Sequence, residues 1–188
     1  MFICVHLWFD LDVWYFAYGS NMQTATLCGR RGIEFVRAAA ARVSGWRLVL
    51  DKPPLLPIGE AFANIVPDAT SAVLGVAYEI SAEALASIDL TEGVLIGNYR
   101  RQAVTAELLN GADARVEAVT LLSERRDASL IPSTRYMALL IEGALEHGLP
   151  AEYVDFLRSI PARPPSLSAE ALRPWLDDAM AALWPRRT

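Results

Sequence analysis

The sequence has few of the side chains that hold metal ions or form disulfide frameworks. Its 188 residues include two cysteines, Cys4 and Cys28, and two histidines, His6 and His147. Two cysteines so far apart provide neither a disulfide framework nor the close spacing of zinc ligands. No cluster of His, Cys and carboxylate residues suggests zinc, and we expect the protein to need no metal and no other cofactor. The scarcity of cysteine also makes a reducing compartment, the cytoplasm, the default location.

Positive charge is also scarce. Lys and Arg number 17 against 22 Asp and Glu, for a formal net charge of -5. An acidic chain is poorly suited to a phosphate backbone or an anionic membrane surface, so we expect no nucleic acid and no membrane among its partners. Arginine pairs occur at residues 30–31, 100–101, 125–126 and 186–187, and most of them are expected on solvated faces.

The N-terminus holds a short hydrophobic run. Residues 1–9 are strongly apolar, but no basic residues precede them, and Asp10 and Asp12 follow at once. This pattern is neither a secretory signal nor a membrane span. It leaves two interpretations: a strand or arm that packs on the body or on a neighbouring subunit, and an extension without functional consequence. At 53% hydrophobic residues, the chain has enough apolar material for one globular domain.

The most informative segment is a loop that follows an apolar, strand-like run. After Tyr18 the run stops in three small residues, Gly19, Ser20 and Asn21, that can expose backbone to a ligand. Residues 22–27 are expected to begin a helix. We expect Gly19 to relax the steric limit on φ. A strand, a tight loop and a helix N-terminus together expose backbone N–H groups that bind a carboxylate or a phosphate. The alternative is an ordinary strand-to-helix turn.

The rest of the chain alternates strand-like and helix-like segments without internal repeats. Strands are expected at 38–50, 73–80, 99–109 and 115–122, with a proline-rich loop at 51–57 and a hairpin turn at Asn110-Gly111. Helices are expected from Ser81 to a cap at Gly93, at 133–147, at 150–160 and, after a linker at 161–165, at 172–184. Strands followed by helices favour an α+β fold.

A second segment, residues 88–101, carries a resemblance to a known family. It reads Ile-Asp-Leu-Thr-Glu-Gly-Val-Leu-Ile-Gly-Asn-Tyr-Arg-Arg. With the loop at 18–21, it resembles the γ-glutamylcyclotransferase family, whose members carry Tyr-Gly-Ser-Asn and a later Glu-Gly-Val followed by Gly-x-Tyr. Further segments match the family in the same order along the chain, two of them before residues 88–101, at 63–67 and 75–80, and three after, at 132–136, 143–144 and 148–153. The resemblance covers about residues 14–161, and its specificity lies in the ordered set of motifs.

The resemblance implies a small closed or nearly closed mixed β-barrel flanked by helices, an α+β fold that periodicity alone could not specify. It divides the chain into an N-terminal extension at 1–13, a γ-glutamylcyclotransferase-like domain at 14–161, and a C-terminal linker and helix at 162–188 that pack on the domain. Since the resemblance begins near Trp14, it favours an N-terminal extension without functional consequence. A place in glutathione metabolism and a homodimer are further expectations.

In the activity that the resemblance implies, the substrate supplies its own nucleophile. The α-amino group of a γ-glutamyl compound attacks the γ-carbonyl, closes the lactam 5-oxoproline and expels an amine or amino acid. The protein has to hold a near-attack conformer and move a proton from the ammonium to the departing amine. Glu92 matches the family's catalytic glutamate and is the candidate general acid–base. The alternative is a surface glutamate beside Asp89.

The resemblance also assigns substrate-binding residues. The candidate cradle for the glutamyl part is the backbone of Tyr18, Gly19, Ser20 and Asn21. Tyr99 and Tyr136 match positions where the family places tyrosines around the pocket. Another pocket tyrosine is expected near residue 120, where this chain has Thr120. The identity of the small-molecule γ-glutamyl substrate therefore stays open among dipeptides, amines and protected metabolites.

Two other functions remain open. A serine hydrolase would use Ser20, but the sequence has no Gly-x-Ser-x-Gly elbow, and only His6 or His147 could act as its base. A noncatalytic binding or scaffold protein of the same fold would keep the anion-binding loop. Formation of 5-oxoproline from γ-glutamyl dipeptides or amines would distinguish the cyclisation from both.

Overall fold

The structure is a computed structural model that describes residues 12–55, 59–109, 114–167, 169–172 and 174–175. Strands in these ranges form a closed barrel in the order β1-β3-β2-β4-β5. Their bounds are β1 Val13–Ala17, β2 Arg37–Lys52, β3 Phe62–Ile80, β4 Arg100–Leu108 and β5 Arg115–Leu122. Paired strands are antiparallel, except that β1 and β5 pair in parallel. The predicted mixed barrel is therefore confirmed.

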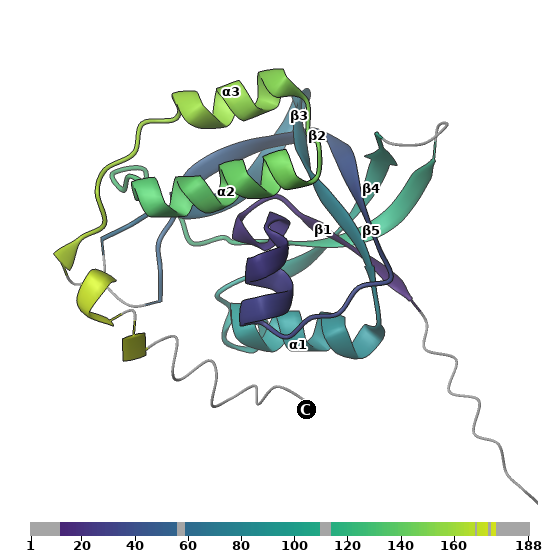
Figure 1. Cartoon of the computed structure of the whole chain (residues 1–188), viewed down its shortest axis with the longest axis horizontal. Helices are drawn as coiled ribbons and strands as arrows, with labels where there is room; N and C mark the ends of the chain where they lie inside the picture. The colour runs from purple at the N-terminus through teal and green to yellow at the C-terminus, as the bar shows by residue number, and fades with distance from the viewer. Residues whose placement is uncertain (1–11, 56–58, 110–113, 168, 173, 176–188) are drawn as a thin grey trace, which may run out of the picture.

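Helices flank the barrel on two sides. They are α1 Ala82–Glu92, α2 Thr134–Glu146 and α3 Ala151–Ser159. Figure 1 shows α2 and α3 side by side along one side of the barrel and α1 on the opposite side. The predicted cap at Ser81 is confirmed, since its hydroxyl accepts a hydrogen bond from the Ala84 N–H, and Gly93 ends α1 with φ +71. None of the helices in the described ranges combines the length and hydrophobicity of a membrane span.

β3 is much longer than the strand predicted at 73–80. β3 includes Pro67, although proline has no N–H for a sheet ladder. Within the described strands, β1 pairs only with residues 76–80 of β3, so Pro67 lies where β2 is the partner. The β2–β3 register shifts beside Gly45, which has φ +83. This irregularity lets β3 continue through the proline.

The segment after the loop is helical, but no single helix begins at residue 22, where one was predicted. Ser20–Met22 forms a 3-10 turn, η1, and Ala25–Arg30 forms a π-helix, η2. Gln23 separates the two, since its ψ of 123° is extended. An extended residue cannot continue a helix, so the chain restarts with a wider turn. Arg31 follows η2 directly.

Some predictions fall on residues that the structure does not describe. They are the hairpin turn at Asn110-Gly111, most of the helix at 172–184 and the first eleven residues of the N-terminal extension. The predicted linker at 161–165 contains a bridge between Arg163 and Ser133, and helical backbone begins at Leu167, earlier than predicted. The division into a domain and two terminal segments stays a prediction.

α2 packs on the body through the apolar positions predicted from their three- and four-residue spacing. Leu140, Gly143 and Ala144 are buried there, and the fully buried side chains of the neighbouring barrel include Phe16 and Tyr78. Among the described elements, α2 contacts η1 most extensively, more than it contacts its neighbour α3. α2 therefore positions the loop that precedes η1.

Gly143 marks the closest approach between α2 and the residues after the loop. A Cβ added there would lie 2.6 Å from the Gln23 nitrogen and 2.7 Å from the Met22 carbonyl carbon. We expect Gly143→Ala to lower the free energy of unfolding by about 1–3 kcal/mol, because backbone atoms must move to admit the methyl group. Urea unfolding followed by circular dichroism measures this change.

Gly29→Ala is the matched control, since a Cβ at Gly29 would have no heavy atom within 4 Å. The control should change the free energy of unfolding by no more than about 0.5 kcal/mol. Equal stability of the two variants would contradict the close packing of α2 on η1.

Candidate active site

One cavity of about 340 Å³ gathers the residues that the sequence singled out. Its walls come from the loop after β1, the end of β2, the start of β3, the C-terminus of α1 and the first turns of α2. They include every predicted site residue: Tyr18, Gly19, Ser20, Asn21, Glu92, Tyr99 and Tyr136. The barrel thus brings together segments that are more than a hundred residues apart in the chain.

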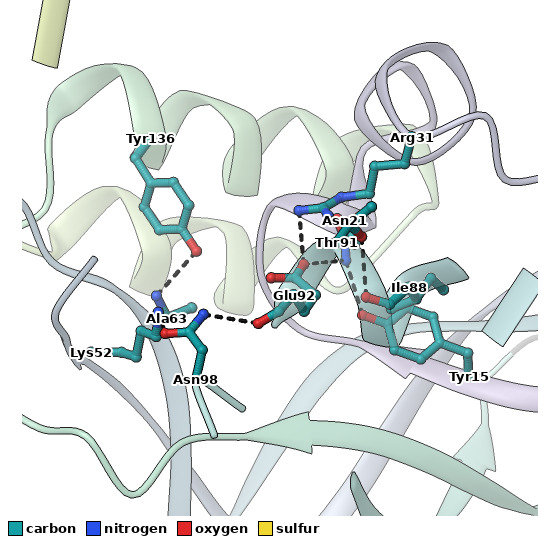
Figure 2. Close-up of polar contacts among 10 residues, drawn as sticks. All are labelled: Tyr15, Asn21, Arg31, Lys52, Ala63, Ile88, Thr91, Glu92, Asn98 and Tyr136. Atoms are coloured by element: carbon teal, nitrogen blue, oxygen red, sulfur yellow. Dashed lines mark hydrogen bonds and ion pairs between the residues drawn. The ribbon is translucent and has the colours of Figure 1, made fainter. Parts of the chain in front are cut away.

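Glu92 is the last residue of α1, and the backbone around it is fixed. Gly93 turns the chain with φ +71, and Asn98 Nδ2 donates to the Glu92 carbonyl at 2.8 Å. The Glu92 side chain is 19% exposed, which contradicts the alternative of a surface glutamate. Its Oε1 lies 2.7 Å from Arg31 Nη2 and accepts from Asn21 Nδ2 at 3.2 Å. Figure 2 shows both contacts on this one oxygen.

Arg31 is a site residue that the sequence reasoning missed. We expected most arginine pairs on solvated faces, but the Arg31 side chain is only 15% exposed. Its Nη1 donates to Thr91 Oγ1 at 2.8 Å while Nη2 pairs with Glu92. A guanidinium at this distance stabilises a negative charge on Glu92 and orients the carboxylate. Nothing in the sequence signals this contact, because it crosses from the end of η2 to α1.

Asn21 connects the loop to Glu92. Its Nδ2 donates to Tyr15 Oη at 3.0 Å as well as to Glu92. Its Oδ1 is buried and has no hydrogen-bond partner within the described ranges. A buried carbonyl oxygen without a donor is costly, so this atom indicates a ligand that brings an N–H group. Tyr15 also lines the cavity and was missed, because it belongs to the apolar strand.

The cavity tyrosines are neutral hydrogen-bonding groups. The Tyr18 hydroxyl donates to the Leu121 carbonyl, and Tyr136 Oη accepts from the Ala63 N–H at 3.0 Å. Burial is the largest cause that raises the pKa of Tyr18, Tyr99 and Tyr136 above the ordinary 10, and the nearby Glu92 charge raises it further. These tyrosines stay protonated at neutral pH, so none of them is a candidate base.

Gly19 is needed for space and not for its backbone angles, which corrects our prediction. Its φ of -114° and ψ of -149° lie outside the left-handed region that favours glycine. A Cβ added at Gly19 would lie 3.2 Å from Tyr136 Oη and 3.4 Å from Ala63 Cβ. The loop therefore packs tightly against α2 and β3, and any larger side chain would intrude there.

The structure does not assemble a serine hydrolase site around Ser20. The His147 ring lies 3.0 Å from Tyr78 Oη and 3.3 Å from Thr24 Oγ1, and His147 is absent from the described cavity wall. His6, the other histidine, lies outside the described residues. The described part of the chain also contains no group of three or more His, Cys, Asp or Glu arranged to hold a metal ion.

Comparisons with known proteins show the family of this chain. A sequence profile of the AIG2-like family matches residues 72–157. The γ-glutamylcyclotransferase of Bos taurus is 30% identical over 153 residues, which are 78% of this chain and 77% of that protein. The chain belongs to the γ-glutamylcyclotransferase family. A γ-glutamyl cyclotransferase of Aspergillus oryzae, aclK, is also 30% identical over 79% of this chain, which spans 61% of that relative's length.

Solved structures show the γ-glutamylcyclotransferase fold. One γ-glutamyl cyclotransferase structure superimposes with a TM-score of 0.70 at 26% identity, and the match covers 86% of this chain and 97% of the other. A Homo sapiens protein, loc79017, gives a TM-score of 0.71 with the same identity and coverage. The predicted family and the predicted fold are thus confirmed.

One departure from the γ-glutamylcyclotransferase pattern has a structural explanation. Thr120 is fully buried, and its Oγ1 donates to the Phe16 carbonyl at 2.8 Å. The described cavity wall contains Leu121 from this strand and not Thr120. Thr120 stands where another pocket tyrosine was expected, but its side chain is directed toward β1.

Proposed function

We propose that this protein is a γ-glutamylcyclotransferase that releases 5-oxoproline and an amine or amino acid, with Glu92 as the general acid–base. The observation that carries the proposal is the Glu92 carboxylate at the wall of a cavity that it shares with residues 18–21. Only Glu92 Oε1 is held by protein groups in the described ranges, so Oε2 can exchange a proton with a ligand.

The proton transfers follow from these contacts. The substrate ammonium lies between Glu92 Oε2 and the unpartnered Asn21 Oδ1, and it gives one proton to Glu92. The free amine attacks the γ-carbonyl, and a new C–N bond closes the five-membered ring. The backbone N–H groups of the loop and the Tyr136 hydroxyl are the donors available for the oxyanion. As the old C–N bond breaks, Glu92 returns the proton to the departing nitrogen. The ring nitrogen then loses its second proton to give the neutral lactam, and the departing amine takes up a proton to become an ammonium.

Incubation with a panel of γ-glutamyl dipeptides and γ-glutamyl amines tests this function. We expect 5-oxoproline and the free amine in equal amounts, detected by mass spectrometry. Release of glutamate in place of 5-oxoproline would mean that water attacks and would favour a hydrolase. Absence of turnover across the panel would favour a noncatalytic binding protein of this fold.

The proposal has four further parts: a reaction that needs no metal, a cytoplasmic location, a role in glutathione metabolism and a homodimer. A chelator should leave the rate of 5-oxoproline formation unchanged, and a glutathione-derived γ-glutamyl peptide should be among the substrates. Light scattering of the purified protein measures its oligomeric state.

The cavity loop provides a further test. We expect Gly19→Val to raise KM strongly while the protein stays folded, because the added methyl groups meet Tyr136 Oη and Ala63 Cβ. Ser20→Ala is the control, since it removes the hydroxyl and keeps the backbone amide, and it should cost only part of the activity. Complete inactivation by Ser20→Ala with a trapped acyl-enzyme would contradict cyclisation.

A further inference from the structure

Lys52 is a buried cation that the proposed reaction does not use. It is the only lysine among the 17 Lys and Arg residues of the chain, and it ends β2. The residue is 3% exposed, yet it lines the cavity. Its Nζ donates to Asn98 Oδ1 at 2.8 Å and lies 4.5 Å from the centre of the Tyr99 ring.

The Lys52 ammonium has no carboxylate within ion-pair distance among the described residues. The ammonium can donate three hydrogen bonds, and within the described ranges it makes one, to Asn98. Buried charges in proteins are normally paired, so an ammonium at a cavity wall with unused donors indicates an anionic ligand. The pKa of Lys52 is lowered to about 8, mainly by burial, while the nearby Glu92 charge opposes this shift and Arg125 adds to it. Lys52 is therefore cationic at neutral pH.

The charge of the cavity wall agrees with this interpretation. Although the whole chain carries a formal charge of -5, the cavity wall contains more cations than carboxylates. The cations are Arg30, Arg31, Lys52 and Arg135, and the carboxylates are Glu60 and Glu92. A wall of this composition favours a ligand with net negative charge.

The position of Lys52 identifies which part of the substrate it faces. Figure 2 shows Arg31 and Asn21 on one side of Glu92 and Lys52 on the other. Asn98 fixes this separation, because its Nδ2 donates to the Glu92 carbonyl while its Oδ1 accepts from Lys52. If the substrate amino group lies at Glu92 and Asn21, the γ-carbonyl points away from them, and the departing group extends toward Lys52.

We propose that the Lys52 ammonium binds a carboxylate on the departing amine, and that Lys52 thereby selects γ-glutamyl conjugates of amino acids against those of uncharged amines. This inference rests on the proposed function and names a specificity-determining residue within it. Lys52 provides a charge-assisted hydrogen bond that an amide in place of the carboxylate cannot match.

The kinetic test compares γ-glutamyl-alanine with γ-glutamyl-alaninamide, which differ only at the carboxylate. For the wild-type protein we expect kcat/KM to favour the acid by about 10- to 100-fold, the range for one hydrogen bond to a charged group. Lys52→Met keeps the apolar stem on Tyr99 and should reduce this preference to about threefold or less. Lys52→Arg should retain most of it.

Arg42→Met is the matched control, because Arg42 is an exposed cation on the same strand and is absent from the described cavity wall. The preference of this variant for the acid should equal that of the wild type. An equal loss of activity toward acid and amide in Lys52→Met would overturn the inference, since Lys52 would then bind the glutamyl part or serve the fold. Absence of 5-oxoproline from either compound with the wild type would instead refute the proposed function.

The single lysine allows a test that does not depend on activity. Protein grown with lysine labelled with 13C at Cε gives one lysine side-chain resonance, and the Glu92→Gln variant prevents turnover during its titration. Addition of γ-glutamyl-alanine should raise the pKa of Lys52 above its value in the ligand-free variant, because a bound carboxylate favours the charged ammonium. The alaninamide should leave it unchanged. Equal shifts with both ligands would contradict a carboxylate at Lys52.

Discussion

Replacing Glu92 by Gln is expected to reduce the rate of 5-oxoproline formation by at least about 100-fold, the lower range for loss of a general acid–base. Gln keeps the shape of the side chain and can still accept hydrogen bonds from Arg31 and Asn21, but it cannot take a proton from the substrate ammonium. The measurement is kcat with the best substrate of the γ-glutamyl panel. Substrate affinity and thermal unfolding should stay close to the wild type.

Asp89→Asn is the control for the loss of one acidic charge from α1. Asp89 pairs with Arg101 at 2.5 Å, and the described cavity wall does not include it. The control should keep its turnover. General acid–base catalysis normally contributes more than a factor of about ten to the rate. If Glu92→Gln retains more than about a tenth of the wild-type rate, Glu92 is therefore not the base. If it unfolds at the temperature of the assay, Glu92 has a structural role instead.

A substrate whose α-amino group is acetylated is expected to give no detectable 5-oxoproline. In the proposed reaction this nitrogen becomes the ring nitrogen, and an amide nitrogen is not an effective nucleophile. The N-acetyl compound keeps its carboxylates, so we expect it to inhibit competitively the turnover of the parent γ-glutamyl dipeptide. Chromatographic detection of 5-oxoproline and of the free departing amine measures both outcomes.

The α-linked isomer of the same dipeptide is the matched control for geometry. It carries a free amine, but that amine faces the wrong carbonyl for a five-membered ring, so it should also fail. Turnover of the N-acetyl compound at the rate of the parent would show that water or a protein side chain attacks the carbonyl. Glu92 would then not be the base that takes a proton from the substrate amine.

Local chemistry explains which elements were predictable from the sequence. Ser81 and Gly93 cap α1 as predicted, because a serine hydroxyl and a left-handed glycine satisfy helix ends wherever they occur. The apolar spacing in α2 was read correctly for the same local reason. The length of β3 was not predicted correctly, since whether Pro67 breaks the strand depends on which neighbouring strand pairs with that residue.

The site residues also divide into those that the sequence predicted and those that it did not. Glu92 and the loop at 18–21 were named from a motif order that the chain shares with its family, and the structure places them in one cavity. Gly19 was assigned the wrong reason, because the restriction at that position comes from Tyr136, more than a hundred residues away. The pairing of Arg31 with Glu92 and the burial of Lys52 were invisible for the same cause.

The sequence by itself determined the family, the caps, the apolar faces and the identity of the candidate base, because these depend on residue type and on spacing along the chain. Only the tertiary structure decided which charges meet. The closed barrel brings the end of η2 to α1 and the end of β2 to Asn98, and so places an arginine beside Glu92 and the single lysine in the cavity wall. Contacts across a barrel depend on strand order and register, which a single sequence specifies only through the fold as a whole.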